Sequence, residues 1–176
     1  MKKEAMEVLL NRRAIRKFKP DAIPADVLDA VLEAGTFAPT GSGRQSPVIL
    51  VVQDEEKVNK VKKLNAKVMG TDRDPYYGAP VILLVLATER AVNEEIAILD
   101  SASVTVNLLN AAYAMGLGSC WIHRAKQTFE TEEGKALLRK WGLKENLVGI
   151  GNFILGYADE SPEAKPRLDG RIVKIG

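Results

Sequence analysis

Residues 81–87 read VILLVLA, and this stretch decides the fold because seven consecutive apolar side chains leave no polar face for water. A strand of this kind is buried on both faces, which predicts a central strand of a sheet. Residues 48–53 and 148–157 are also apolar and rich in branched side chains, and residues 119–122 are short and β-prone. The sequence therefore predicts a central sheet built from strands spread along the chain.

Helical periodicity occupies much of the chain between these strands. The pattern predicts helices over residues 3–11, 24–35, 55–69, 93–115 and 131–141. Residues 36–47 are rich in Gly, Ser, Thr and Pro, which predicts a loop. The longest helix is apolar or small nearly all round, which predicts burial in the core or at a subunit interface. Together the elements predict an α+β fold.

Length and composition narrow the classes of protein. The chain has 176 residues, of which 46% are hydrophobic, so we expect one domain, residues 1–176, with a real core. The longest apolar run, residues 79–87, is far shorter than a membrane span, and the N-terminus lacks a signal-peptide pattern. We therefore expect a cytoplasmic protein with no membrane partner. A single cysteine and a single histidine exclude an internal disulfide and a Cys/His zinc cluster.

The net charge of +2 hides an uneven distribution along the chain. Residues 1–19 carry +5 and residues 165–176 carry +3, so the residues between them carry −6. One interpretation is that both ends are simply solvated. The other is that both ends contribute to a single anion-binding site.

Three arginines in five residues, Arg12, Arg13 and Arg16, follow the first predicted helix. Guanidinium groups bind phosphate or carboxylate through paired hydrogen bonds, and a bound anion relieves their mutual repulsion. Lys165 and Arg167 flank a proline in the C-terminal segment, which stiffens their relative placement. These two segments are the candidate anion ligands.

Two further segments are candidates for binding a flat ligand. In the loop over residues 38–47, small residues allow backbone amides to approach a ligand closely. The segment over residues 116–123 contains Cys120 and His123. Three residues of extended chain place these side chains on opposite faces, so we expect Cys120 to be a small packed residue rather than a nucleophile.

Taken in order, these segments resemble the FMN-dependent nitroreductase family, and the resemblance spans nearly the whole chain. Five motifs carry it: NRRAIRKF at 11–18, APTGSGRQ at 38–45, YGAPV at 77–81, GLGSCWI at 116–122 and KPR at 165–167. The resemblance implies a nitroreductase-like α+β fold, with a central, mostly antiparallel sheet covered by helices. It also implies a homodimer with two FMN sites at its interface.

The implied activity is that of an FMN-dependent NAD(P)H oxidoreductase. Hydride from NADH or NADPH would pass through the flavin, in a ping-pong sequence, to a nitroaromatic, quinone or related electron-poor small molecule. The flavin performs the chemistry, so no residue is assigned as a general acid or base, and no metal or nucleic acid is implied.

The resemblance also implies roles for single residues. Residues of the arginine motif and the C-terminal segment would bind the FMN phosphate and ribityl chain: Arg12, Arg13, Ala14, Arg16, Lys165 and Arg167. A second group would contact the flavin ring. Four of its residues would come from the second subunit: Pro39, Thr40, Gly41 and Gln45. The others are Asn65, Ser119, Cys120, Trp121 and Ile122. Asn65 would hydrogen-bond the polar edge of the ring. Three residues are candidate substrate contacts: Tyr76, Tyr77 and His123.

Some features depart from the family pattern, and other functions stay open. Ala14 replaces a usual hydroxyl residue, Gly43 stands where asparagine is common, and Ser46-Pro47 replaces a Gln-Pro-aromatic sequence. A branch of the family with reductive dehalogenase or flavin-fragmenting activity is one alternative. A non-catalytic flavin-binding protein is another. Nucleic-acid binding by the basic ends is weaker, because they lack interleaved aromatic residues.

Overall fold

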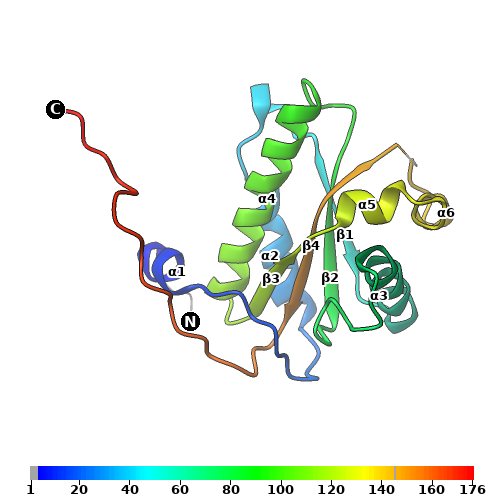
Figure 1. The fold of residues 1–176 in the computed structure, drawn as a ribbon, viewed down its shortest axis with the longest axis horizontal. Helices are drawn as coiled ribbons and strands as arrows, with labels where there is room; N and C mark the ends of the chain where they lie inside the picture. The colour runs from blue at the N-terminus through cyan, green and yellow to red at the C-terminus, as the bar shows by residue number, and fades with distance from the viewer. Residues whose placement is uncertain (1–3, 145) are drawn as a thin grey trace.

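The computed structural model describes residues 4–144 and 146–176, and its centre is a four-stranded sheet in the order β1-β2-β4-β3 (Figure 1). All three neighbouring pairs are antiparallel. The strands are β1 (Pro47–Val52), β2 (Val81–Ala87), β3 (Gly118–Ile122) and β4 (Val148–Gly156). All seven residues of β2 are buried, which confirms it as an interior strand.

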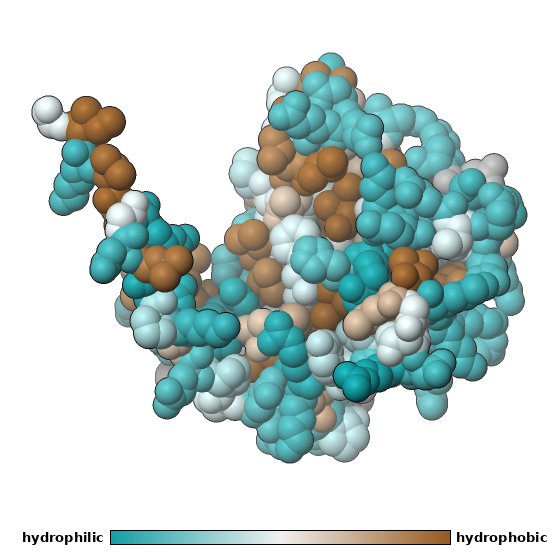
Figure 2. Space-filling model, viewed as in Figure 1, coloured by the Kyte–Doolittle hydropathy of each residue, from teal (hydrophilic) through white to brown (hydrophobic). Residues whose placement is uncertain are grey.

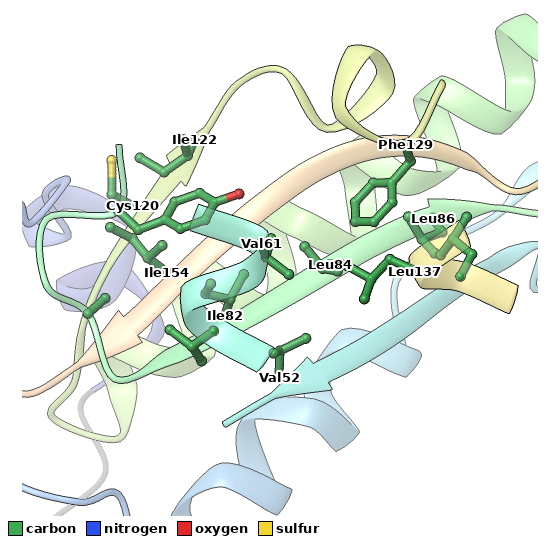
Figure 3. Close-up of a cluster of buried hydrophobic side chains, with 14 residues drawn as sticks. Val52, Val61, Ile82, Leu84, Leu86, Cys120, Ile122, Phe129, Leu137 and Ile154 are labelled. Carbon is green, nitrogen blue, oxygen red and sulfur yellow. The ribbon is translucent and has the colours of Figure 1, made fainter. Parts of the chain in front are cut away.

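Helices cover both faces of the sheet (Figure 1). One layer holds α2 (Ala25–Thr36) and α4 (Glu94–Ala114), and the other holds α3 (Glu55–Met69), α5 (Ala125–Glu130) and α6 (Glu132–Lys140). Alternate residues of β2 pack against opposite helical layers. Ile82, Leu84 and Leu86 pack in the core cluster toward α3, α5 and α6, while Leu83 and Val85 pack in the cluster toward α2 and α4. Figure 3 shows the first cluster, in which β2 side chains meet side chains from the second helical layer.

Two helices differ from the sequence prediction. The predicted helix over 131–141 is present as α6, but α5 precedes it and was not predicted, although its Phe129 is buried. The central part of α4 is not buried all round, because Leu99 and Val106 are 55% and 48% exposed. By length and composition α4 could cross a membrane, yet 44% of that window is buried inside the protein. It packs on α2 and the sheet as a core helix.

The two ends of the chain run side by side near β3. A short helix, α1 (Ala5–Asn11), leads into residues 12–19, where the amide of Ile15 donates to the carbonyl of Ser119 at 2.9 Å. The amide of Lys19 donates to the carbonyl of Tyr157, also at 2.9 Å, just beyond the end of β4. Residues 159–176 are exposed throughout, and their last part projects away from the body (Figure 1).

Candidate functional site

A cavity of about 310 Å³ opens at the end of β3. Three segments form its wall: Arg16 from the N-terminal segment, residues 73–75 and Tyr77 from the loop after α3, and residues 120–124 from β3 and the turn after it. Met69 at the end of α3 completes the lining. The N-terminal segment runs alongside β3, which brings Arg16 of the predicted arginine motif and the predicted GLGSCWI segment to one place.

The predicted arginines have different environments. Arg12 is half-buried and has no carboxylate within ion-pair distance among the described residues. Burial, and then the neighbouring charge of Arg13, lowers the pKa of the Arg12 guanidinium from its ordinary value. The Arg13 guanidinium instead donates to the carbonyls of Leu10 and Arg12, both at 2.8 Å, at the end of α1. Arg12 is therefore the partly desolvated cation that lacks an internal anion.

The strand next to these arginines carries alternating side chains. Cys120 and Ile122 are buried in the core cluster toward α3, as a packed cysteine requires. Burial is the main cause that raises the pKa of the Cys120 thiol, so the neutral form dominates near pH 7. The hydroxyl of Ser119 is buried without a hydrogen-bond partner, and the indole of Trp121 lies over Gly151. Ala14 pairs with Ser119 through a parallel bridge.

The turn after β3 is fixed by buried amides. Asn65 and Asn152 each donate to the carbonyl of His123, at 3.0 and 3.1 Å, and neither asparagine has exposed surface. The Arg124 Nε donates to Asn65 Oδ1 at 3.2 Å. Asn65 was expected to face the polar edge of a flavin, but the structure places it behind the cavity wall, where its amide holds the protein's own backbone. His123 is exposed and lines the cavity.

The turn over residues 74–78 separates the two tyrosines. Asp74 accepts hydrogen bonds from the amides of Tyr76 and Gly78, both at 2.8 Å, and forms an ion pair with Lys62 at 3.1 Å. This turn buries Tyr76 completely, and burial raises the pKa of its phenol far above the ordinary value. Tyr76 was expected to contact substrate, but the structure does not place its side chain in the cavity lining, because that side chain has no exposed surface. Tyr77 is 44% exposed and does line it.

The predicted loop over residues 38–47 lies elsewhere on the same chain. Asp100 of α4 anchors it, since its carboxylate accepts from the Gly41 amide and the Ser46 hydroxyl, both at 2.8 Å. A Cβ atom at Gly41 would come within 2.6 Å of the Ile96 side chain, so a larger residue here would force that side chain to move. Thr40 and Gln45 line a separate cavity of about 350 Å³, which shares no lining residue with the first. Pro39 is exposed beside it.

The C-terminal cations are not joined to the arginine motif within one chain. Lys165 and Arg167 are exposed, and the Arg167 guanidinium donates to the carbonyl of Lys165. In residues 4–144 and 146–176, no hydrogen bond or ion pair links either side chain to Arg12, Arg13 or Arg16. Only the start of the tail lies beside that motif, where Glu160 accepts from the Arg16 amide.

Backbone strain is concentrated around these two cavities. Among the described residues, four non-glycine residues have positive φ: Ser42, Gln45, Tyr77 and Arg124. The first two belong to the loop over residues 38–47, and the last two stand on the rim of the 310 Å³ cavity. Such conformations cost about 1–3 kcal/mol each and cluster at ligand-binding places. The predicted ligand-facing loop over residues 38–47 therefore holds two strained residues, and two more line the cavity beside the predicted segment over residues 116–123.

Sequence reasoning did not assign roles to several residues that hold these cavities. Asp100 and Asn152 could have been found, because each is a polar residue within an apolar helix or strand. Asp74, Arg73 and Arg124 give no such signal, since charged residues are ordinary in loops. Among the described residues, no group of three His, Cys, Asp or Glu side chains could hold a metal ion.

Comparison with known proteins adds an independent observation. The family model described as "Nitroreductase family" matches residues 9–75 and 70–157. The NADPH-flavin oxidoreductase of Vibrio harveyi is 29% identical over 180 residues, which cover 96% of this chain and 71% of that protein.

Solved structures agree with the fold. A nitroreductase of Bacteroides fragilis NCTC 9343 with bound FMN superposes with a TM-score of 0.86 at 28% identity, covering 99% of this chain and 100% of that chain. A nitroreductase of Desulfitobacterium hafniense DCB-2 with bound FMN gives a TM-score of 0.87 over the whole of both chains. At 20% identity, that second likeness concerns the fold alone.

Proposed function

The chain belongs to the nitroreductase family, and from that premise we propose that it is a cytoplasmic FMN-dependent NAD(P)H oxidoreductase. Its acceptors are nitroaromatics, quinones or related electron-poor small molecules. Relatives named as an NADPH-flavin oxidoreductase and an FMN reductase (NADPH), and an FMN-bound nitroreductase structure, support both the cofactor and the reaction class.

The observation that carries the proposal is the environment of Arg12. A half-buried guanidinium without a counter-ion is costly, and a bound phosphate would supply the missing charge. Arg16 lines the adjacent cavity together with residues 120–124 of β3 and the turn after it. A phosphate, a polyhydroxyl chain and a flat ring fit this set of donors and walls.

In this assignment, Arg12 and Arg16 bind the phosphate end of FMN, and residues 120–123 form a wall for the ring. FMN, when bound, supplies the redox chemistry by taking a hydride from NAD(P)H and passing two electrons to the acceptor. The buried amides of Asn65 and Asn152 hold that wall in place. Cys120, neutral and packed, has no role in proton transfer.

The complete site in this proposal needs two chains. Thr40 and Gln45 line a different cavity from Arg16, and Gly41 belongs to the same loop, so we propose that these residues reach the ring from a second subunit. Hydrophobic surface gathers over α4, and more lies at the end of the tail (Figure 2). A homodimer that covers this surface would also bring the loop over residues 38–47 of one chain to the arginine motif of its partner.

A visible absorption spectrum tests the proposal directly. The purified protein, supplied with FMN and then desalted, is expected to stay yellow and to lose its flavin absorbance when NADH or NADPH is added without oxygen. Adding a nitroaromatic or a quinone should restore the colour. A protein that retains no FMN would refute the proposal, and one that neither nicotinamide bleaches would favour the non-catalytic flavin-binding alternative.

A further inference from the structure

Two arginines on the outer wall of the 310 Å³ cavity have no part in the roles assigned so far. Arg73 lines the cavity from the loop after α3, and Arg124 lines it from the turn after β3. Neither has a carboxylate within ion-pair distance in the part of the chain that the structure describes. The cavity's one acidic lining residue, Asp74, is already bound to Lys62 and to two backbone amides.

This lack of partners contrasts with the cations on the outer surface. Within residues 4–144 and 146–176, six lysines form ion pairs with exposed acidic side chains: Lys17, Lys60, Lys67, Lys126, Lys135 and Lys144. The body of the chain, with its excess of acidic residues, thus offers carboxylates to many surface cations. Arg73 and Arg124 instead line a cavity that has two other charged residues in its lining, Arg16 and Asp74. Asp74 is already paired with Lys62.

Arg124 is held in position before any ligand arrives. Its Nε donates to Asn65 Oδ1, and the Nδ2 of the same buried amide donates to the carbonyl of His123. The terminal nitrogens of the guanidinium are left for a ligand. Arg124 also keeps a positive φ of 75°, which is an unfavourable backbone conformation for arginine. A side chain fixed from behind in this way loses little conformational freedom when it binds an anion.

The cavity also offers a flat aromatic surface. Tyr77 is 44% exposed and has a φ of 55°, so the turn held by Asp74 presents its ring to the cavity instead of the core. Guanidinium groups bind carboxylate and sulfonate oxygens in pairs, and an aromatic ring stacks on tyrosine. We propose that this cavity selects acceptors that are electron-poor aromatic acids. Arg73 and Arg124 bind the anionic group, and Tyr77 contacts the ring. The inference rests on the proposed function.

A pair of matched acceptors tests this subsite. 4-Nitrobenzoate carries the anion, and 4-nitrobenzamide is a neutral molecule of the same shape. With saturating NADH as donor, the first reduction converts the nitro group to a nitroso group. NADH gives two electrons with its hydride, solvent supplies the second proton, and water leaves. The wild-type protein is expected to prefer nitrobenzoate in kcat/KM by about tenfold, as a charge-assisted hydrogen bond would give.

Arg73→Gln is expected to reduce kcat/KM for nitrobenzoate about tenfold, mainly through KM, and for nitrobenzamide at most twofold. Lys57→Gln removes the same charge from the exposed face of α3 and is expected to leave the preference between the acceptors unchanged. Titration of the oxidised yellow protein with benzoate gives a readout that does not need turnover. Arg73→Gln should weaken the resulting perturbation of the flavin spectrum about tenfold.

Three outcomes would overturn the inference. Equal losses with both acceptors would mean that Arg73 has no anion selectivity. A loss of NADPH-driven but not NADH-driven turnover would assign Arg73 to the donor's extra phosphate. A weaker affinity for FMN would assign it to the cofactor. FMN content and bleaching by NADH are measured first on the wild-type protein, so failure of the proposed function is seen separately.

Discussion

Arg12 is the single residue on which cofactor retention should depend most. Its guanidinium is half-buried without an internal anion, so we expect it to bind the FMN phosphate through charge-assisted hydrogen bonds. Arg12→Ala should raise the Kd for FMN about tenfold or more, since such a bond contributes about 1.5–3 kcal/mol. Adding Arg167→Ala should raise it further if the tail reaches the same phosphate. Fluorescence titration of apoprotein with FMN measures both.

Lys17 provides the matched control for Arg12. It lies in the same basic segment, but its ammonium already pairs with Asp159 at 2.6 Å on the surface. Lys17→Ala should therefore change FMN affinity by less than about twofold, since exposed pairs contribute little. An unchanged affinity in Arg12→Ala would place the phosphate elsewhere.

Asp100 is the residue whose removal should destabilise the loop over residues 38–47. Asp100→Ala leaves the Gly41 amide and the Ser46 hydroxyl without their acceptors inside the protein. We expect the free energy of unfolding to fall by about 3 kcal/mol, because hydrogen bonds to charged groups are worth about 1.5–3 kcal/mol each. Urea unfolding followed by circular dichroism measures this. Ser103→Ala, on the same helix, should change stability by about 0.5 kcal/mol or less, and an equal loss in both variants would contradict the anchoring role.

At the scale of elements, the pattern of apolar residues correctly predicted those strands and helices whose sequence is determined by which of their faces are buried. The β2 strand and the α3 helix match the predicted residues, because one is buried on both faces and the other has a regular apolar stripe. The short α5 helix escaped prediction since six residues are too few to show a periodicity. The predicted burial of α4, in the core or at a subunit interface, is met only on one side within a single chain, because Leu99 and Val106 stay exposed there. A pattern of apolar residues does not say whether the chain itself or a second subunit covers them.

Parts of the candidate site that depend on residues close together in the sequence could be predicted. The orientation of a side chain toward the cavity or the core could not, because it depends on the folded backbone. Three arginines in five residues indicate an anion, and the structure sets Arg16 in the cavity wall and Arg12 close enough to affect the pKa of Cys120. Tyr76 and Tyr77 look equivalent in sequence, yet the turn around Asp74 buries one and exposes the other. The sequence did not indicate that the Asn65 amide binds the protein's own backbone, because a buried asparagine can bind backbone as readily as a ligand.

At the scale of the whole molecule, two surfaces of the single chain are unusually apolar. One surface is formed by α1 and α4, where six large apolar side chains of the described residues are between 42% and 64% exposed: Met6, Leu9, Leu10, Ile98, Leu99 and Val106. The other is the tail, where Leu168, Ile172, Val173 and Ile175 are at least 78% exposed. Apolar surface gathered in this way is typical of association sites. A homodimer that covers these surfaces would also bring together the cavity that Arg16 lines in one chain and the loop over residues 38–47 of the other.

A charge in the exposed face of α4 should therefore separate the subunits and release the cofactor together. Leu99→Glu places a carboxylate where we propose that apolar surface is buried, and a buried unpaired charge is strongly unfavourable. The wild-type protein should sediment as a dimer at micromolar concentration, and Leu99→Glu as a folded monomer with FMN affinity at least tenfold weaker. Lys140→Glu, on the exposed face of α6 across the sheet, should stay dimeric and yellow. A wild-type monomer that retains FMN would contradict the two-chain site. In a monomer, the loop over residues 38–47 lies at a separate cavity, and no second subunit is present to supply it.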